Sequence, residues 1–149
     1  MEIIINEFSQ LSKIGRENVL NFWNIHNLKY QETKNLETAF NSFTAYYNIK
    51  IVSIMGIFNI KDSNGGDLYF SDRKVILFDI SDIASEHSKY NIVLQLITAG
   101  LMFSKEKGFV PIFRHPDSKI MDIFIRELKI PDDLSAAYER LLGDNTEKK

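Results

Sequence analysis

Few side chains in this sequence have both the type and the spacing that catalysis requires. His26 follows Trp23 by three residues in a segment of helical periodicity, and a neutral imidazole there would act as a general base toward an amine nucleophile. Asp79 and Asp82 flank the end of an apolar segment, a spacing that would present carboxylates near a site. A helix-surface histidine without a chemical role is the alternative for His26, and both interpretations stay open.

The other histidines and acids have structural explanations of at least equal weight. His87 precedes a long apolar segment, where it would contact either an anion or solvent. His115 stands before Pro116 at an expected strand end, which suits a functional group or a turn. Asp132 and Asp133 are expected to interact with a helix dipole. The acids and histidines do not have metal-ligand spacing, so we expect no metal.

Composition excludes several classes of protein. The chain has no cysteine, which excludes disulfide scaffolds, zinc ribbons, iron–sulfur clusters and thiol nucleophiles. A Ser/His/Asp order, a Walker loop and a dinucleotide fingerprint are missing. The formal charge of −2, from 18 Lys and Arg against 20 Asp and Glu, gives no global reason to bind nucleic acid or an anionic membrane. Without an export signal or a transmembrane segment, the expected location is cytoplasmic.

The apolar pattern predicts the elements that would position these residues. With 149 residues, 44% of them hydrophobic, we expect one α/β domain over residues 1–143 and a polar tail over 144–149. Three- and four-residue spacing predicts helices over 16–28, 35–47, 90–107 and 119–128, with another from Pro131. Runs of β-branched and bulky residues predict strands over 2–8, 49–60, 68–70, 74–83 and 109–113.

Three local expectations concern the first half of the chain. The helices over 16–28 and 35–47 are expected to pack as a hairpin. Gly56, inside the strand over 49–60, suggests a bend or bulge there. The Asn-Gly-Gly sequence within 62–67 predicts a tight β-hairpin turn, because these residues accept positive φ.

The second half of the sequence predicts a crossover connection between two parallel strands. The helix over 90–107 is apolar around almost its whole circumference, so we expect it to be buried, with Gly108 as its cap. The strand–helix–strand sequence between Lys74 and Phe113 requires a right-handed parallel connection, whereas the turn at 62–67 makes the earlier strands antiparallel. The predicted fold is therefore α/β (α+β), with a mixed, mostly antiparallel sheet, one parallel βαβ crossover, and helices on both faces.

This element order resembles the fold of the GNAT acyltransferases, in which two N-terminal helices precede an antiparallel meander and a central strand leads into the coenzyme A helix. The resemblance covers roughly Glu2 to Leu128. The stretch over 99–112 is similar to the end of the family's cofactor helix and its next strand, and 125–130 occupies the place of the segment before its final strands. The resemblance implies acyl-CoA as cofactor and an amine-bearing small molecule or protein as acceptor.

One departure from that family concerns the cofactor itself. The family opens its long helix with a glycine-rich turn, but the corresponding stretch over 84–91 has no glycine. The resemblance assigns Ser88, Lys89 and Asn91 to the pyrophosphate, with Lys89 neutralising a phosphate, while Glu86 opposes an anion. A cofactor site rebuilt from side chains and an absent cofactor site both remain open.

A second resemblance is to the toxin-activating lysine acyltransferases. It rests on the Ser-Asp-Arg-Lys sequence over 71–74 and the strand that follows, through 79–84. That family uses an amino-terminal His and a later Asp, so the resemblance implies His26 and Asp82 as the catalytic pair.

Two functional hypotheses follow. The first is a divergent acyl-CoA-dependent N-acyltransferase, in which an amine attacks the thioester directly. The second is a non-catalytic protein-binding module on the same fold, for example an immunity or anti-defence protein that blocks a bacterial partner. In that case Asp79, Asp82 and Glu86 would meet a basic protein surface. Separated strands with an open cleft beside residues 80–91 would favour the enzyme. A cleft filled by the protein's own side chains would favour the binding module.

Overall fold

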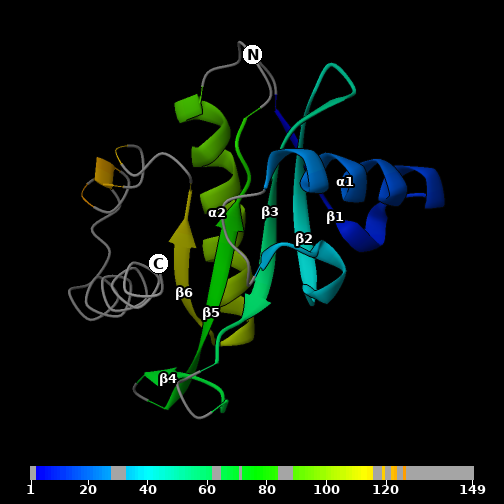
Figure 1. The fold of residues 1–149 in the computed structure, drawn as a ribbon. Coiled ribbons are helices and arrows are strands. Elements are labelled where there is room, and N and C mark those ends of the chain that lie inside the picture. The colour runs from blue at the N-terminus through cyan, green and yellow to red at the C-terminus, as the bar shows by residue number, and fades with distance from the viewer. Residues whose placement is uncertain are drawn as a thin grey trace.

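The computed structural model describes residues 3–27, 33–61, 65–70, 72–83 and 89–115, together with Lys119, Asp122, Ile123 and Arg126. Its elements follow one another along the chain as Figure 1 shows. Their bounds are β1 (Ile4–Glu7), η1 (Phe8–Gln10), α1 (Lys13–His26), η3 (Leu36–Thr38), β2 (Asn41–Tyr47), β3 (Lys50–Asn59), β4 (Tyr69–Phe70), β5 (Arg73–Ile80), α2 (Lys89–Lys107) and β6 (Val110–Arg114).

The six strands form one mixed sheet. Its order is β1-β2-β3-β5-β4, with β6 also paired to β5. Every pairing is antiparallel except that of β5 with β6, which is parallel and runs in register from Val75 opposite Val110 to Asp79 opposite Arg114. Helix α2 connects these two strands. The predicted parallel crossover and the mostly antiparallel sheet are therefore confirmed.

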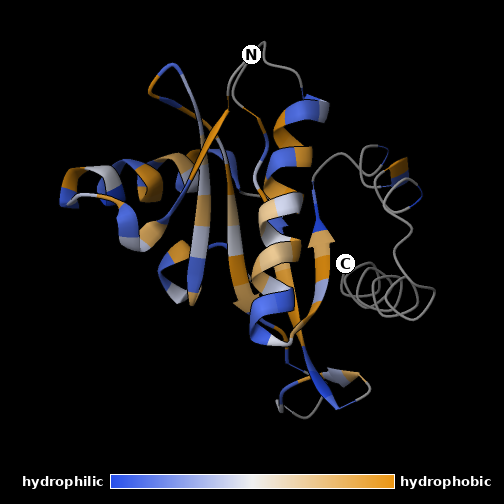
Figure 2. Ribbon diagram, turned by 180° about the vertical axis from the view of Figure 1, so that it is seen from behind, coloured by the Kyte–Doolittle hydropathy of each residue, from blue (hydrophilic) through white to orange (hydrophobic). Residues whose placement is uncertain are grey.

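The sheet separates two hydrophobic clusters because successive strand residues point to opposite faces. On β5, Val75 and Leu77 join the cluster that contains Val19 and Trp23 of α1. Ile76 and Phe78 join the cluster packed under α2. Figures 1 and 2 show α1 and α2 on opposite faces of the sheet, as predicted.

Helix α1 confirms the helix predicted over 16–28 but begins earlier. Ser12 is its N-cap, and the Ser12 hydroxyl accepts a hydrogen bond from the Gly15 N–H at 3.1 Å, which satisfies one of the free donors of the first turn. Its apolar face buries Val19 and Trp23 completely. The helix ends where the Asn27 N–H donates to the Trp23 carbonyl at 2.9 Å.

The helix predicted over 35–47 is wrong, and so is the predicted helical hairpin. Only the short η3 is helical there, and residues 41–47 form β2 between β1 and β3. Residues 42–45 are all buried, because both faces of β2 are covered. Phe43 and Ala45 face α2, and Ser42 and Thr44 face the α1 side. Leu36 and Phe40 precede the strand, and their distance in sequence from Phe43 and Tyr47 of β2 matches helical spacing by coincidence.

The bulge exists, but not at Gly56. Ala45 pairs with Ser53 and Tyr46 with Ile51, which leaves Val52 as the extra residue. Gly56 pairs in register, and its lack of a side chain serves packing: a Cβ there would lie 2.6 Å from Phe58 Cε2.

Helix α2 is less buried than its composition predicted. Its buried residues fall on one face, and Met102 on the outer face is 69% exposed. The sheet covers only the inner face, and water tolerates single apolar side chains on the outer one. Gly108, at φ +75°, confirms the predicted cap. None of the described helices is long and apolar enough to cross a membrane.

Several expectations lie wholly or largely outside the described residues. The turn residues at 62–64 are among them, although the bridge between Lys61 and Asp67 confirms antiparallel pairing around this turn. In the helix predicted over 119–128, the four residues that are described are helical. The helix from Pro131 and the tail over 144–149 are not described.

Candidate functional site

The candidate site lies where the parallel strands stop pairing, beside the first turn of α2. Pairing of β5 with β6 ends at Asp79 and Arg114, whereas β5 continues along β3, where the Ser81 N–H donates to the Ile54 carbonyl at 2.8 Å. Two residues after Arg114 the sequence has Pro116, which lacks the backbone N–H that a continued β-ladder would need. The ladder between the two strands therefore ends at the carboxyl edge, the edge at which open α/β sheets place their ligands.

A buried ion pair closes the strands on the α1 face of this edge. Arg114 donates from Nε to Asp79 Oδ1 and from Nη2 to Asp79 Oδ2, both at 3.1 Å. Asp79 and Arg114 are 0% and 1% exposed. The Thr33 hydroxyl donates to Asp79 Oδ2 and accepts from Arg114 Nη2. These charge-assisted bonds offset the cost of removing two charges from water.

The same network reaches the last turn of α1. The Thr33 carbonyl accepts from Trp23 Nε1 at 2.9 Å and from Asn27 Nδ2 at 3.1 Å. A strand end and a helix end that are far apart in sequence are thus joined through buried hydrogen bonds. Because His26 directly precedes Asn27, its backbone is held beside this edge of the sheet.

The two predicted catalytic residues come to this edge from different elements. His26 is half-buried and stacks on Phe22, with ring centroids 4.1 Å apart. Asp82 is exposed, and its Oδ1 accepts from the Ile83 N–H at 2.9 Å. No hydrogen bond joins His26 to Asp82 within the described part of the chain.

The assignment of Asp79 to a partner-binding surface is wrong. Its carboxylate is fully buried against Arg114, so it cannot meet a basic protein. Sequence reasoning missed Arg114 and Thr33 as members of the site. One signal was present, because Asp79 and Arg114 each come at the end of an apolar run, and an in-register parallel pairing places them opposite one another.

The first turn of α2 provides donors for an anion. Lys89 is its first residue and is exposed, Asn91 is partly buried, and no acidic residue lies in this turn. The first N–H groups of a helix lack intrahelical partners, and the helix dipole is positive there. These donors suit a diphosphate. Ser88, Glu86 and His87 lie outside the described residues.

Metal ligands are not grouped at this site. Among the residues that the structure describes, no cluster of His, Asp and Glu could hold a metal ion.

Solved acetyltransferases have a similar fold. A ribosomal-protein-alanine N-acetyltransferase from Brucella melitensis biovar Abortus 2308 is 12% identical at a TM-score of 0.52, over 94% of this chain and 90% of that chain. An aminoglycoside N-acetyltransferase in complex with CoA is 14% identical at a TM-score of 0.59, over 87% and 88%. A transcriptional regulator from Bacillus halodurans C-125 is 14% identical at a TM-score of 0.54, over 87% and 93%.

At these identities the similarity concerns the fold. No protein-family model matches the sequence, and no curated protein matches it at a significant level. The architecture is that of the GNAT acyltransferases, as the element order predicted. A fold shared by enzymes and a regulator does not by itself define an activity, which must come from the site.

Proposed function

We propose that this protein is an acyl-CoA-dependent N-acyltransferase. The observation that carries the proposal is the first turn of α2, which begins with Lys89, contains no acidic residue, and follows the carboxyl end of β5 in the chain, where the ladder with β6 ends. The similarity to an acetyltransferase in complex with CoA supports the choice of cofactor. An amine-bearing acceptor is the matching class of second substrate.

Lys89 and Asn91 would hold the pyrophosphate of the coenzyme, together with Ser88. The Lys89 ammonium neutralises phosphate charge, and the backbone N–H groups of the turn donate to phosphate oxygens. Side chains thus replace the glycine-rich turn that is missing from 84–91. When bound, acyl-CoA would supply a thioester carbonyl that an amine can attack, so that the C–N bond of the amide forms, the C–S bond breaks and the coenzyme leaves as its thiol.

His26 and Asp82 would act on the acceptor amine. The amine must lose a proton as it attacks, and an imidazole takes up a proton readily near neutral pH. The exposed carboxylate of Asp82 attracts the cationic form of the acceptor. The buried Asp79–Arg114 pair and Thr33 position the end of α1, and therefore His26, without contacting the reactants.

Calorimetry with acetyl-CoA and a longer acyl-CoA tests the proposal. We expect micromolar dissociation constants and at least about a tenfold loss of affinity in Lys89→Glu, because the substitution places a like charge beside a phosphate. Lys105→Glu, at the opposite end of the same helix, is the matched control and should bind normally. Absence of binding up to about millimolar concentration would refute the cofactor assignment.

A kinetic experiment separates catalysis from binding. With an accepted amine, His26→Gln should lower kcat by roughly 10²- to 10⁴-fold, the usual contribution of a general base, and leave acetyl-CoA affinity unchanged. A normal kcat in His26→Gln would remove His26 from the mechanism.

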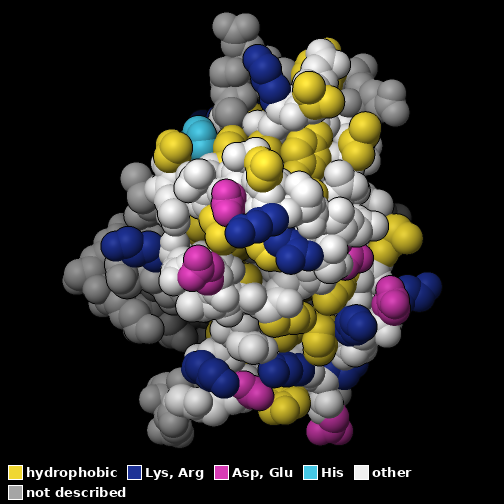
Figure 3. Space-filling view, turned by 90° about the vertical axis from the view of Figure 1, so that its right-hand side faces the viewer, with side chains coloured by type: hydrophobic (Ala, Val, Ile, Leu, Met, Phe, Trp, Pro, Cys, Tyr) yellow, Lys and Arg dark blue, Asp and Glu magenta, His cyan; other side chains and the backbone are white. Residues whose placement is uncertain are grey.

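The non-catalytic binding module would be favoured if acyl-CoA does not bind. Asp79, one of the three acids expected to meet a basic partner, is buried and cannot do so. Figure 3 shows basic and acidic side chains interspersed over the face that carries α1, without a patch of one sign. A pull-down with the intact chain would then be the next experiment.

A further inference from the structure

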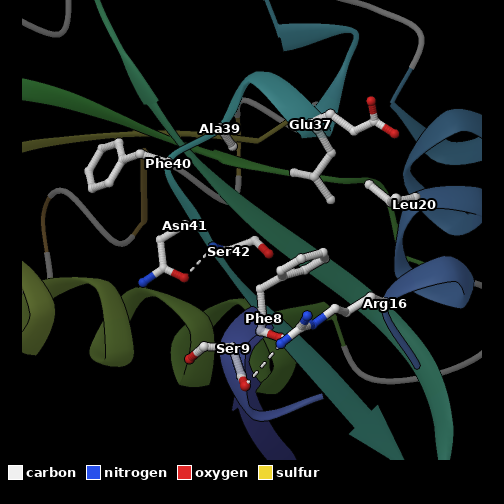
Figure 4. Close-up of a pocket in the computed structure, with 10 residues that line it drawn as sticks. Phe8, Ser9, Arg16, Leu20, Glu37, Ala39, Phe40, Asn41 and Ser42 are labelled. Atoms are coloured by element: carbon white, nitrogen blue, oxygen red, sulfur yellow. Dashed lines mark hydrogen bonds between the residues drawn. The ribbon is translucent and has the colours of Figure 1, made fainter. Parts of the chain in front are cut away.

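A pocket of about 400 Å³ lies near the first turns of α1, away from the candidate site (Figure 4). Arg16 lines it, whereas His26 ends the same helix ten residues later, about 15 Å along the helix axis. Its wall comes from η1, α1, η3 and the start of β2. The polar residues of the wall are Ser9, Arg16, Glu37, Asn41 and Ser42, and the others are apolar.

Arg16 provides a cation that is held in place at this pocket. Its Nε donates to the Phe8 carbonyl and its Nη2 to the Ser9 carbonyl, both at 3.3 Å, and its guanidinium lies 5.5 Å from the centroid of the Phe8 ring. These bonds use two of the five N–H donors of a guanidinium. Among the described residues no carboxylate pairs with Arg16, so the remaining donors are available to a ligand.

Ser42 provides an independent reason to expect a ligand. The residue is 2% exposed, and its hydroxyl has no hydrogen-bond partner among the described residues. Figure 4 shows the Ser42 hydroxyl on the side that faces Phe8 and Arg16. A buried hydroxyl without a partner is unfavourable, and a ligand oxygen that reached this point would satisfy it.

The rest of the wall is apolar apart from Ser9, Asn41 and Glu37, and Figure 4 shows the Glu37 carboxylate pointing away from Arg16 and Ser42. Leu20, Leu36 and Ala39 line the pocket, and Phe40 remains 45% exposed. The volume exceeds the needs of an inorganic anion and lies within the range of about 300–1,000 Å³ typical of small-molecule sites. The pocket therefore combines a fixed cation and a buried hydroxyl with an apolar surface.

We infer that this pocket binds a small organic carboxylate with an apolar body. The Arg16 guanidinium matches a carboxylate in geometry and charge, the Ser42 hydroxyl donates to a carboxylate oxygen, and Leu20, Leu36 and Phe40 cover the apolar body. The inference does not depend on the proposed acyltransferase activity, because the pocket shares none of its residues with the candidate site.

Amide chemical shifts of the full chain provide the test, with phenylacetate as the probe. We expect saturable shifts at Arg16 and over 39–42. Phenylacetamide lacks the charge and acetate lacks the ring, so each should bind at least about tenfold more weakly. Equal affinity for phenylacetate and phenylacetamide, or no saturation up to about 10 mM phenylacetate, would overturn the inference.

Single substitutions test whether phenylacetate binds in this pocket. Arg16→Gln and Ser42→Ala should each weaken phenylacetate binding, Arg16→Gln by about tenfold or more and Ser42→Ala by several-fold. Ser42→Ala removes a hydroxyl without a partner in the described chain, so folding should be preserved. Lys13→Gln, an exposed cation on the same helix that does not line the pocket, is the control. Loss of affinity in Lys13→Gln equal to that in Arg16→Gln would indicate general charge attraction and contradict the inference.

Discussion

The two ends of β5 carry the same chemical groups in opposite environments. Near its beginning, Asp67 pairs with Lys61 at 2.6 Å and with Lys74 at 3.3 Å, and these side chains are between 28% and 56% exposed. At its end, Asp79 pairs with Arg114 at 3.1 Å, and both side chains are buried. Water can hydrogen-bond to the exposed Asp67 in place of Lys61 and Lys74, but it cannot replace the partners of the buried Asp79 and Arg114.

The difference in burial between these ion pairs indicates which end of β5 is held rigidly by its polar contacts. Exposed ion pairs contribute little because solvent and salt screen them. The buried pair instead joins β5, β6 and the end of α1 through Thr33. A buried charge that lost its partner would be strongly unfavourable. The carboxyl end of β5 is therefore the fixed end, and it is the end beside α2 and the candidate site.

The largest expected effect comes from removing one charge of the buried pair. Asp79→Asn removes the carboxylate charge that pairs with the buried Arg114 guanidinium, so the free energy of unfolding should fall by about 3–5 kcal/mol. Urea denaturation measures this change. A loss below about 1 kcal/mol, the value typical of an exposed pair, would show that the two ends of β5 do not differ in this way.

Removing both charges is the control for that experiment. In the double variant Asp79→Leu with Arg114→Met, both charges of this pair are removed together, and stability should recover most of what the single substitution loses. Recovery would attribute the cost to the unpaired charge and not to lost packing.

A smaller effect is expected at Thr33. Thr33→Val removes the hydroxyl that bonds both Asp79 and Arg114. A hydrogen bond to a charged group contributes about 1.5–3 kcal/mol, and two bonds that share one hydroxyl do not add in full. Urea denaturation of Thr33→Val should show a loss in this range. Thr38→Val, whose hydroxyl bonds the Asn35 carbonyl at an exposed position, should stay within about 0.5 kcal/mol of the wild type.

The smallest effect is expected at the exposed end. Hydrogen bonds from Lys61 and then Lys74 lower the pKa of Asp67 below its ordinary value. Because the pKa is lower in the folded state, the stabilisation is present above the unfolded value of about 3.9 and is lost as the pH falls through the folded pKa. Carboxyl NMR titration should show this lowered pKa. Lys61→Gln should raise it more than Lys74→Gln, and added salt should also raise it.

The second half of the chain was predictable because its signals are local. The apolar run of β5, the long α2, Gly108 and the apolar run of β6 follow one another and allow one connection only. In the first half, Leu36, Phe40, Phe43 and Tyr47 have helical spacing, yet β2 is buried on both faces, so periodicity could not separate strand from helix.

The candidate site was only partly predictable for a related reason. His26, Asp82, Lys89 and Asn91 could be named from residue type and position along the chain. The Asp79–Arg114 pair joins residues that are 35 positions apart, and it appears only when the parallel register is known. The Arg16 pocket likewise combines segments whose proximity depends on β2 being a strand.

Amide chemical-shift mapping with acetyl-CoA tests most directly whether the fixed end of β5 is the functional end. We expect saturable changes in amide chemical shift at Ser81–Ile83 and in the first turn of α2, with little change over Tyr69–Lys74. Lys89→Glu should weaken these shifts. Shifts concentrated at Tyr69–Lys74, or no shifts up to about millimolar acetyl-CoA, would contradict this expectation.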